Sequence, residues 1–215
     1  MKKTLTIICV VALFSAALLA QNGTRMSRTP EQAGMRAPAA DPDNSYKQIW
    51  SNAGGKTDSW NDTAGWNVTG PNSSGGKTQW VAMPFKPKQS STAYQLQAAI
   101  EYASGDNQVN LGLYADNDGV PGTLLGGPVT ITGLANTGTC CTFAVANLAS
   151  AVSLTGGAQY WIVATTPTSG TGSDFAGVWY FVNLTPITSF NGGSGWSSAS
   201  GYEQNPVGRV FGTIP

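Results

Sequence analysis

Three tryptophans in segments rich in Gly, Ser and Asn have the clearest potential for ligand binding. Trp60, Trp66 and Trp196 each stand between small or polar neighbours. An indole ring on a loop offers a flat apolar face to the C–H side of a sugar ring, whose hydroxyls bond to nearby amides and carboxylates. The polar and secondary partners expected beside these rings are Asn61, Asp62, Asn67 and Tyr202. The alternative is that the rings cover the edges of a sheet.

The sequence Asp116-Asn-Asp-Gly119 allows two interpretations. Acidic and amide oxygens at alternate positions favour Ca²⁺, which makes Asp116 and Asp118 candidate ligands. The EF-hand pattern does not continue, because Pro121 follows closely and no Glu occupies the twelfth position. A polar hairpin turn explains the same residues, since Asn, Asp and Gly tolerate a positive φ. The turn is the preferred interpretation, without a cofactor, and Ca²⁺ is the alternative.

The residues present give little support to catalysis. The chain has no histidine, which excludes Ser-His-Asp and Cys-His nucleophile systems and His-ligated zinc or haem. Glycosidases need two carboxyl groups about 5 to 10 Å apart. The two glutamates of the predicted folded part, Glu101 and Glu203, are far apart in sequence, and most aspartates lie in expected turns. We therefore expect a protein that is not an enzyme, with a hydrolase as the third hypothesis.

Two adjacent cysteines, Cys140 and Cys141, cannot build the disulfide framework of a small secreted domain. In a strand they would point to opposite faces, giving one buried thiol and one outward thiol. A strained vicinal disulfide or an intermolecular bridge remains an alternative.

Length and charge predict one exported domain. The 215 residues carry equal numbers of acidic and basic side chains, so no basic patch for nucleic acid is expected. Lys2 and Lys3 precede an apolar stretch that ends in small residues, which predicts a signal peptide over 1–20 and no membrane span after its cleavage. Residues 21–44 lack aromatic side chains and predict a disordered leader, and 45–215 predict the folded domain.

Hydrophobic alternation with period two predicts strands throughout that domain. Residues 96–102 and 109–115 alternate clearly, and they are separated by a turn at Gly105. Further strands are expected at 79–83, 129–131, 141–145, 160–164, 178–182 and 207–211. Short strands between Gly, Asn, Ser and Pro turns, without an amphipathic helix, predict an all-β fold. We expect a two-sheet antiparallel β-sandwich that is jelly-roll-like.

Several segments carry a resemblance to a known family. Val109-Asn-Leu-Gly-Leu-Tyr-Ala-Asp116, then Pro121-Gly-Thr-Leu-Leu125, then Leu154-Thr-Gly-Gly-Ala-Gln-Tyr-Trp161 resemble the bacterial choice-of-anchor extracellular β-sandwich domains over about residues 78–213. Thr155-Gly156 stands where the family usually has Ala-Gly. The resemblance implies a secreted or surface-displayed domain without catalytic residues. The sorting signal usual in that family is not evident, so we expect release into the periplasm or medium.

The function expected from these observations is a secreted, non-enzymatic module that binds an extracellular polysaccharide or a surface protein. The alternative is a structural, self-assembling protein of the envelope or extracellular matrix. Low charge and open strand edges favour self-association in that case.

Overall fold

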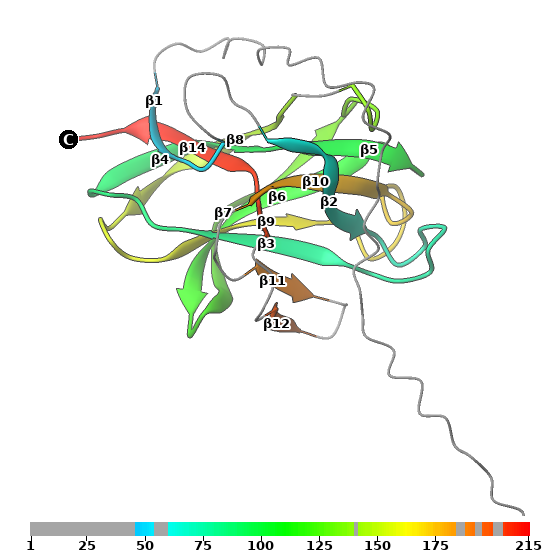
Figure 1. Ribbon diagram of the computed structural model, residues 1–215. Helices are drawn as coiled ribbons and strands as arrows, with labels where there is room; N and C mark the ends of the chain where they lie inside the picture. Colours follow the sequence, from blue (N-terminus) through cyan, green and yellow to red (C-terminus); the bar gives the residue numbers. More distant parts are fainter. Residues whose placement is uncertain (1–45, 54–59, 140–141, 184–187, 192–194, 200–203) are drawn as a thin grey trace, which may run out of the picture.

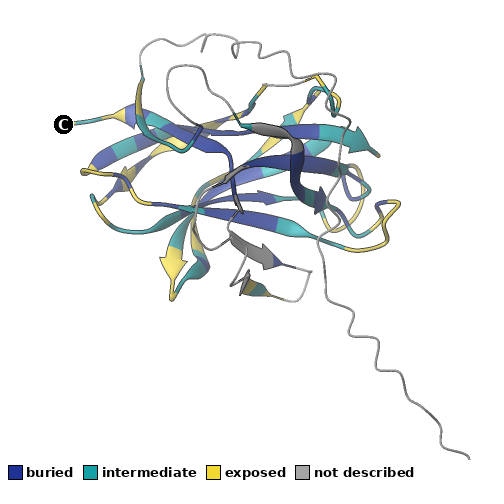
Figure 2. Ribbon diagram, in the orientation of Figure 1, coloured by how far each residue is buried: buried dark blue, intermediate teal, exposed yellow. Residues whose placement is uncertain are grey.

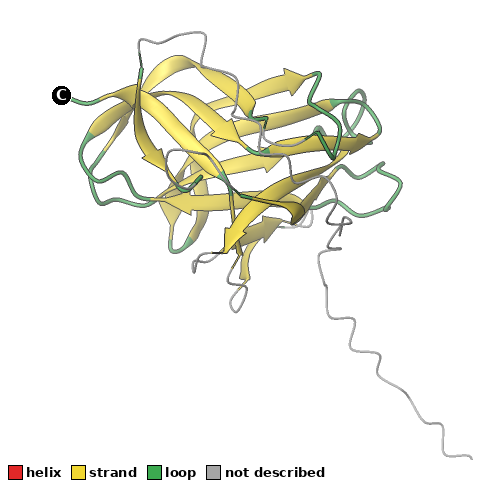
Figure 3. Cartoon of the chain, turned by 45° about the horizontal axis from the view of Figure 1, so that its top comes forward, coloured by secondary structure: helices red, strands yellow, loops and turns green. Residues whose placement is uncertain are grey.

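The computed structural model describes residues 46–53, 60–139, 142–183, 188–191, 195–199 and 204–215 (Figure 1). The predicted signal peptide and leader, as well as Cys140 and Cys141, lie outside these residues. The described chain consists of strands joined by turns and loops (Figure 3). Within it, no helix is long and apolar enough to cross a membrane.

The strands group into three antiparallel sheets. Their bounds are β1 Lys47–Ser51, β2 Asn61–Thr69, β3 Trp80–Phe85, β4 Ser91–Ala98, β5 Ile100–Ser104, β6 Gln108–Asn117, β7 Val120–Thr132, β8 Ala144–Leu154, β9 Tyr160–Thr165, β10 Ala176–Asn183, β11 Thr188–Asn191, β12 Trp196–Ala199, β13 Gln204–Pro206 and β14 Gly208–Thr213. One sheet has the order β1-β14-β4-β8, and a second has β2 and β13 on either side of β10, with β5 also paired to β10. The third has the order β12-β11-β3-β9-β6-β7. The first two sheets are joined and form one layer of the sandwich. The six-stranded sheet forms the other layer. The predicted all-β antiparallel sandwich is confirmed, and its jelly-roll order remains a prediction.

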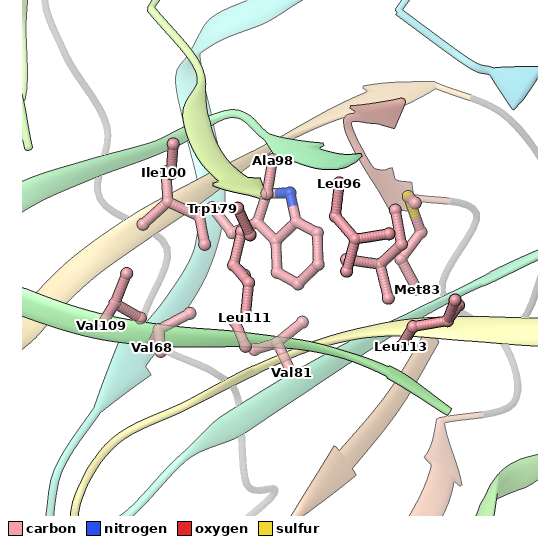
Figure 4. Close-up of a cluster of buried hydrophobic side chains, with 14 of the residues drawn as sticks. Val68, Val81, Met83, Leu96, Ala98, Ile100, Val109, Leu111, Leu113 and Trp179 are labelled. Atoms are coloured by element: carbon pink, nitrogen blue, oxygen red, sulfur yellow. The ribbon is translucent and has the colours of Figure 1, made fainter. Parts of the chain in front are cut away.

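Alternation within the strands builds the core between the two layers. Leu96, Ile100 and Trp179 point inward from one layer and meet Leu111 and Leu113 from the six-stranded sheet, as Figure 4 shows. All five are completely shielded from solvent. Buried segments run through the middle of both layers, and exposed residues gather at turns and on outer strands (Figure 2).

The two sheets of the first layer join at a three-strand junction. Ala99 separates β4 from β5, and Val207 separates β13 from β14. The Ala99 N–H donates to the Val207 carbonyl (3.1 Å), the Val207 N–H donates to the Tyr180 carbonyl (2.8 Å), and the Tyr180 N–H donates to the Ala99 carbonyl (3.0 Å). This closed triangle of backbone hydrogen bonds brings three distant segments to one point. On one side of the junction β14 pairs with β4, and on the other side β10 pairs with β5.

Two side chains complete the hydrogen bonding around Val207. The Asn52 Nδ2 donates to the Pro206 carbonyl, and its Oδ1 accepts from the Gly208 N–H, both at 2.8 Å. The buried Trp179 Nε1 donates to the Val207 carbonyl at 2.8 Å. A strand that changes partners leaves polar backbone groups without ladder bonds, and unpaired buried groups are costly. Asn52 and Trp179 therefore stabilise the bend.

We predict that Asn52→Ala lowers the free energy of unfolding by about 2 kcal/mol, because two hydrogen bonds to the junction are lost. Urea unfolding followed by tryptophan fluorescence measures this change. The control is Asn72→Ala, which removes one hydrogen bond to Ser173 Oγ from an exposed residue and should cost less than about 1 kcal/mol. Equal losses in the two variants would contradict a special role for Asn52.

Candidate functional site

The outer face of the six-stranded sheet carries an aromatic cluster. Alternation turns Leu111 and Leu113 of β6 and Ile162 of β9 into the core, so Tyr114 and Trp161 point to the other side. Trp161 packs there with Ala82 and Val163, and all three are fully buried. Tyr114 and Trp196 pack against this group and are themselves only partly buried.

Curvature of the sheet explains how an outward tryptophan becomes buried. β12 and β7 are the two edge strands of this sheet, yet parts of them lie close to each other. The sheet therefore curls toward its outer side around Trp161. Trp196 of β12 packs against the cluster of Ala82, Trp161 and Val163 and remains only partly buried.

Gly112 makes room for the ring of Tyr114 in this cluster. A Cβ at Gly112 would lie 2.9 Å from Tyr114 Cε2 and 3.1 Å from Leu124 Cδ1, so the tyrosine ring occupies space that any other residue would fill. Leu124 is 38% exposed. Burial raises the pKa of Tyr114, so its hydroxyl stays protonated through neutral pH.

Asp116 provides the polar edge of this face. Its Oδ1 accepts hydrogen bonds from the Trp161 Nε1 and from the Gln159 Nε2, both at 2.7 Å. Its Oδ2 accepts from the Gly119 N–H at 3.3 Å. Asp118 and Gly119 both have a positive φ (52° and 85°) and form the two-residue hairpin turn between β6 and β7, as predicted.

This arrangement combines the two features that sugar recognition needs. Trp196 and Tyr114 offer apolar ring surface, and the exposed Asp116 lies at its border. A carboxylate has about four acceptor positions, of which Asp116 uses three, and the Gln159 amide carries a second N–H and a carbonyl oxygen. No group of three acidic or cysteine side chains converges on a metal position in the part of the chain that is described. Ca²⁺ at Asp116 and Asp118 remains an untested alternative.

The structure brings together two predicted site residues that are far apart in sequence. Trp196 packs against the cluster that contains Trp161, and Asp116 accepts the hydrogen bond of the Trp161 Nε1–H. Asp118 belongs to the adjoining turn. Sequence reasoning missed Tyr114 and Gln159, although Gly112, Tyr114 and Asp116 alternate with core leucines and so had to share a face.

The loop placement expected for Trp66 is wrong. Trp66 lies in β2, where it is 7% exposed and packs in the core, with its ring centroid 6.1 Å from that of Phe181. Ala64, Trp66 and Val68 alternate, which is the strand signal that the neighbouring Gly and Asn hid. Trp66 therefore has no free face for a ligand, and we leave it out of the site.

The remaining predicted residues belong to the other layer or lie outside the described part. Trp60 is half-buried directly before β2, and Asn67 pairs with Val178 of β10, so neither joins Trp196. The side chains of Asn61 and Asp62 and the whole of Tyr202 lie outside what the structure describes. Trp80, expected in the core, is half-buried, and its Nε1 donates to Thr166 Oγ1 at 2.9 Å.

No protein-family model matches the chain, and no curated protein matches it. The resemblance to choice-of-anchor domains therefore remains a prediction.

We predict that Asp116→Ala lowers the free energy of unfolding by about 2 kcal/mol, because the buried Trp161 N–H then loses its acceptor. Asp116→Asn keeps an acceptor oxygen and should cost less than about 1 kcal/mol. Asp118→Asn is the matched control and should be nearly neutral, since Asn also tolerates a positive φ. Denaturant unfolding distinguishes the three variants. A loss in Asp116→Asn as large as that in Asp116→Ala would contradict a role through the acceptor.

Proposed function

We propose that this protein is a secreted, non-enzymatic β-sandwich module that binds an extracellular glycan through the outer face of its six-stranded sheet. The observation that supports this most is the partly exposed Trp196, which packs against the cluster of Ala82, Trp161 and Val163, while Asp116 bonds to Trp161 and to Gln159 at the border of that cluster. Stacking surface and oriented polar groups thus occur on one face.

Preorganisation favours binding by this face. The Trp161 indole and the Gln159 amide hold the Asp116 carboxylate in one orientation before a ligand arrives. Groups that are already fixed lose less conformational entropy on binding. The target is a neutral polysaccharide or a glycan-bearing surface protein, in keeping with a chain in which acidic and basic residues are few and nearly balanced. A secreted choice-of-anchor-type domain is the class that fits this proposal.

A second candidate function is self-assembly through strand edges. β7 and β8 are edge strands of the two layers, lie against each other and contain no charged residue. Leu124, Leu125 and Val145 on these strands are the exposed large hydrophobic residues of the described chain. Register shifts interrupt the pairing of both strands, however, and bulges of this kind hinder edge-to-edge pairing. Glycan binding is therefore the first proposal.

We predict that Trp196→Ala weakens glycan binding by about 1 to 3 kcal/mol, because the stacking surface is removed. An array of xylan, mannan, β-glucan, chitin and peptidoglycan identifies the ligand, and calorimetry with its soluble fragments gives the affinity. Trp66→Phe is the control, since it should lower the melting temperature and leave the affinity unchanged. Failure of the protein to bind any glycan on the array would refute the proposal, as would unchanged binding by Trp196→Ala.

The self-assembly alternative predicts a mass that rises with protein concentration in light scattering. Leu125→Lys would then restore the monomer, because a charge on an edge strand opposes pairing. The glycan proposal instead expects a monomer at all concentrations when no ligand is added. A ligand-free oligomer that Leu125→Lys dissociates would favour assembly.

A further inference from the structure

Buried polar side chains are concentrated on the outer face of the other layer. Of the ten buried polar or charged residues in the described chain, six belong to strands of this layer, and all of these except Ser91 alternate with its core residues. The five that alternate are Gln95, Gln97, Glu101, Asn205 and Arg209. An outer sheet face is usually either solvated or apolar, so a buried polar face needs an explanation.

Most of the polar side chains on this face contact other side chains of the protein. Gln97 Nε2 donates to Gln95 Oε1 at 2.7 Å, and Glu101 Oε2 accepts from the Tyr180 hydroxyl at 2.9 Å. The Arg209 guanidinium lies 4.3 Å above the ring centre of Phe143, and burial lowers its pKa. The charged groups thus have their own contacts within the protein.

Two neutral groups have no such contact. Among the described residues, the Trp60 Nε1–H and the Asn205 Oδ1 are shielded from solvent and have no hydrogen-bond partner. Asn205 is only 3% exposed. Leaving a buried donor or acceptor unpaired costs about 1 to 3 kcal/mol each, so such groups usually mark a bound water or a ligand.

The residues that carry these two groups lie on opposite sides of β10, close to Phe181. Asn61 of β2 and Pro206 of β13 both pair with Phe181 of β10. Asn205 pairs with the residue after Phe181, and Trp60 directly precedes Asn61 on the other side of β10. Their backbones are two strand spacings apart, about 10 Å. That separation leaves a small molecule within reach of both side chains.

We propose that this face is a second binding site, which takes a neutral, hydroxyl-bearing ligand of the size of one sugar residue between Trp60 and Asn205. An anion would accept a hydrogen bond from the indole N–H but be repelled by the amide oxygen. A cation would be attracted by the amide oxygen but repelled by the indole N–H. Hydroxyl groups donate and accept, so one polyhydroxylated ring can bond to both. The Trp60 ring, packed edge-on against Phe143 with centroids 4.9 Å apart, adds an apolar wall. This site is separate from Trp196 and goes beyond the function proposed above.

The indole N–H signal of Trp60 provides a direct test. The chain has seven tryptophans, and Trp60→Phe identifies which indole signal in a ¹H–¹⁵N NMR spectrum belongs to Trp60. We expect D-glucose, D-galactose, D-mannose or N-acetyl-D-glucosamine to shift this signal saturably. Asn205→Leu should weaken that binding at least tenfold, and it should leave the melting temperature unchanged or higher because a buried unpaired acceptor is removed. Trp196→Ala should leave the shift intact.

The outcomes separate this inference from the glycan proposal. A Trp60 signal that none of the four sugars moves would mean that the two groups bind water only, and it would overturn the inference even if Trp196 binds a polysaccharide. A shift that survives Asn205→Leu, or that disappears in Trp196→Ala, would overturn it as well. A saturable shift that depends on Asn205 supports the second site, even if the array finds no ligand for the Trp196 face.

Discussion

The closed triangle of hydrogen bonds among Ala99, Tyr180 and Val207 is the constraint on which the first layer depends. Without it, β4 and β14 would continue as one flat pair, and β10 could not enter beside β5. Asn52 and Trp179 bind the carbonyl groups around Val207 that this change of partners exposes. The core follows from the same point, because Trp179 reaches the middle of the sandwich while its indole N–H is held at the junction.

The bend also determines which side chains become buried outside the sandwich. Ala99, Tyr180 and Val207 form a small second apolar cluster on the outer face, and Trp60 and Phe143 pack onto it. The six-stranded sheet reaches a similar result differently, since its curl places β12 near β7 and buries Trp161. Both layers therefore have an outer face on which aromatic and polar side chains are withdrawn from water. Flat sheets would leave those faces solvated, so the candidate sites depend on curvature.

Period-two alternation was sufficient to predict the fold class and most core strands, because alternation is a local property of the chain. β6 and β9 lie close to their predicted places, and along β9 Tyr160 and Trp161 point to opposite faces. β2 was missed because Gly65 and Asn67 resemble loop residues, although Gly65 is required there: a Cβ would lie 2.5 Å from the Trp179 carbonyl oxygen. The break at Ala99 carries no local signal, since its cause is the approach of Tyr180 and Val207 from distant segments.

The residues of the candidate site could be predicted in part, but their proximity could not, because it too depends on distant segments. Sequence identifies Trp196 and Asp116 as residues whose chemistry suits ligand binding, but their arrival at one aromatic cluster depends on how the strands of the six-stranded sheet are arranged. A tryptophan on an outer face would ordinarily expose its indole N–H to water, which would satisfy it. Trp161 is instead fully buried, so its indole N–H has the Asp116 carboxylate as its acceptor. This hydrogen bond joins β9 to its neighbour β6 and also fixes the carboxylate of this face, so the stability of the face and the glycan recognition that we propose for it share one hydrogen bond.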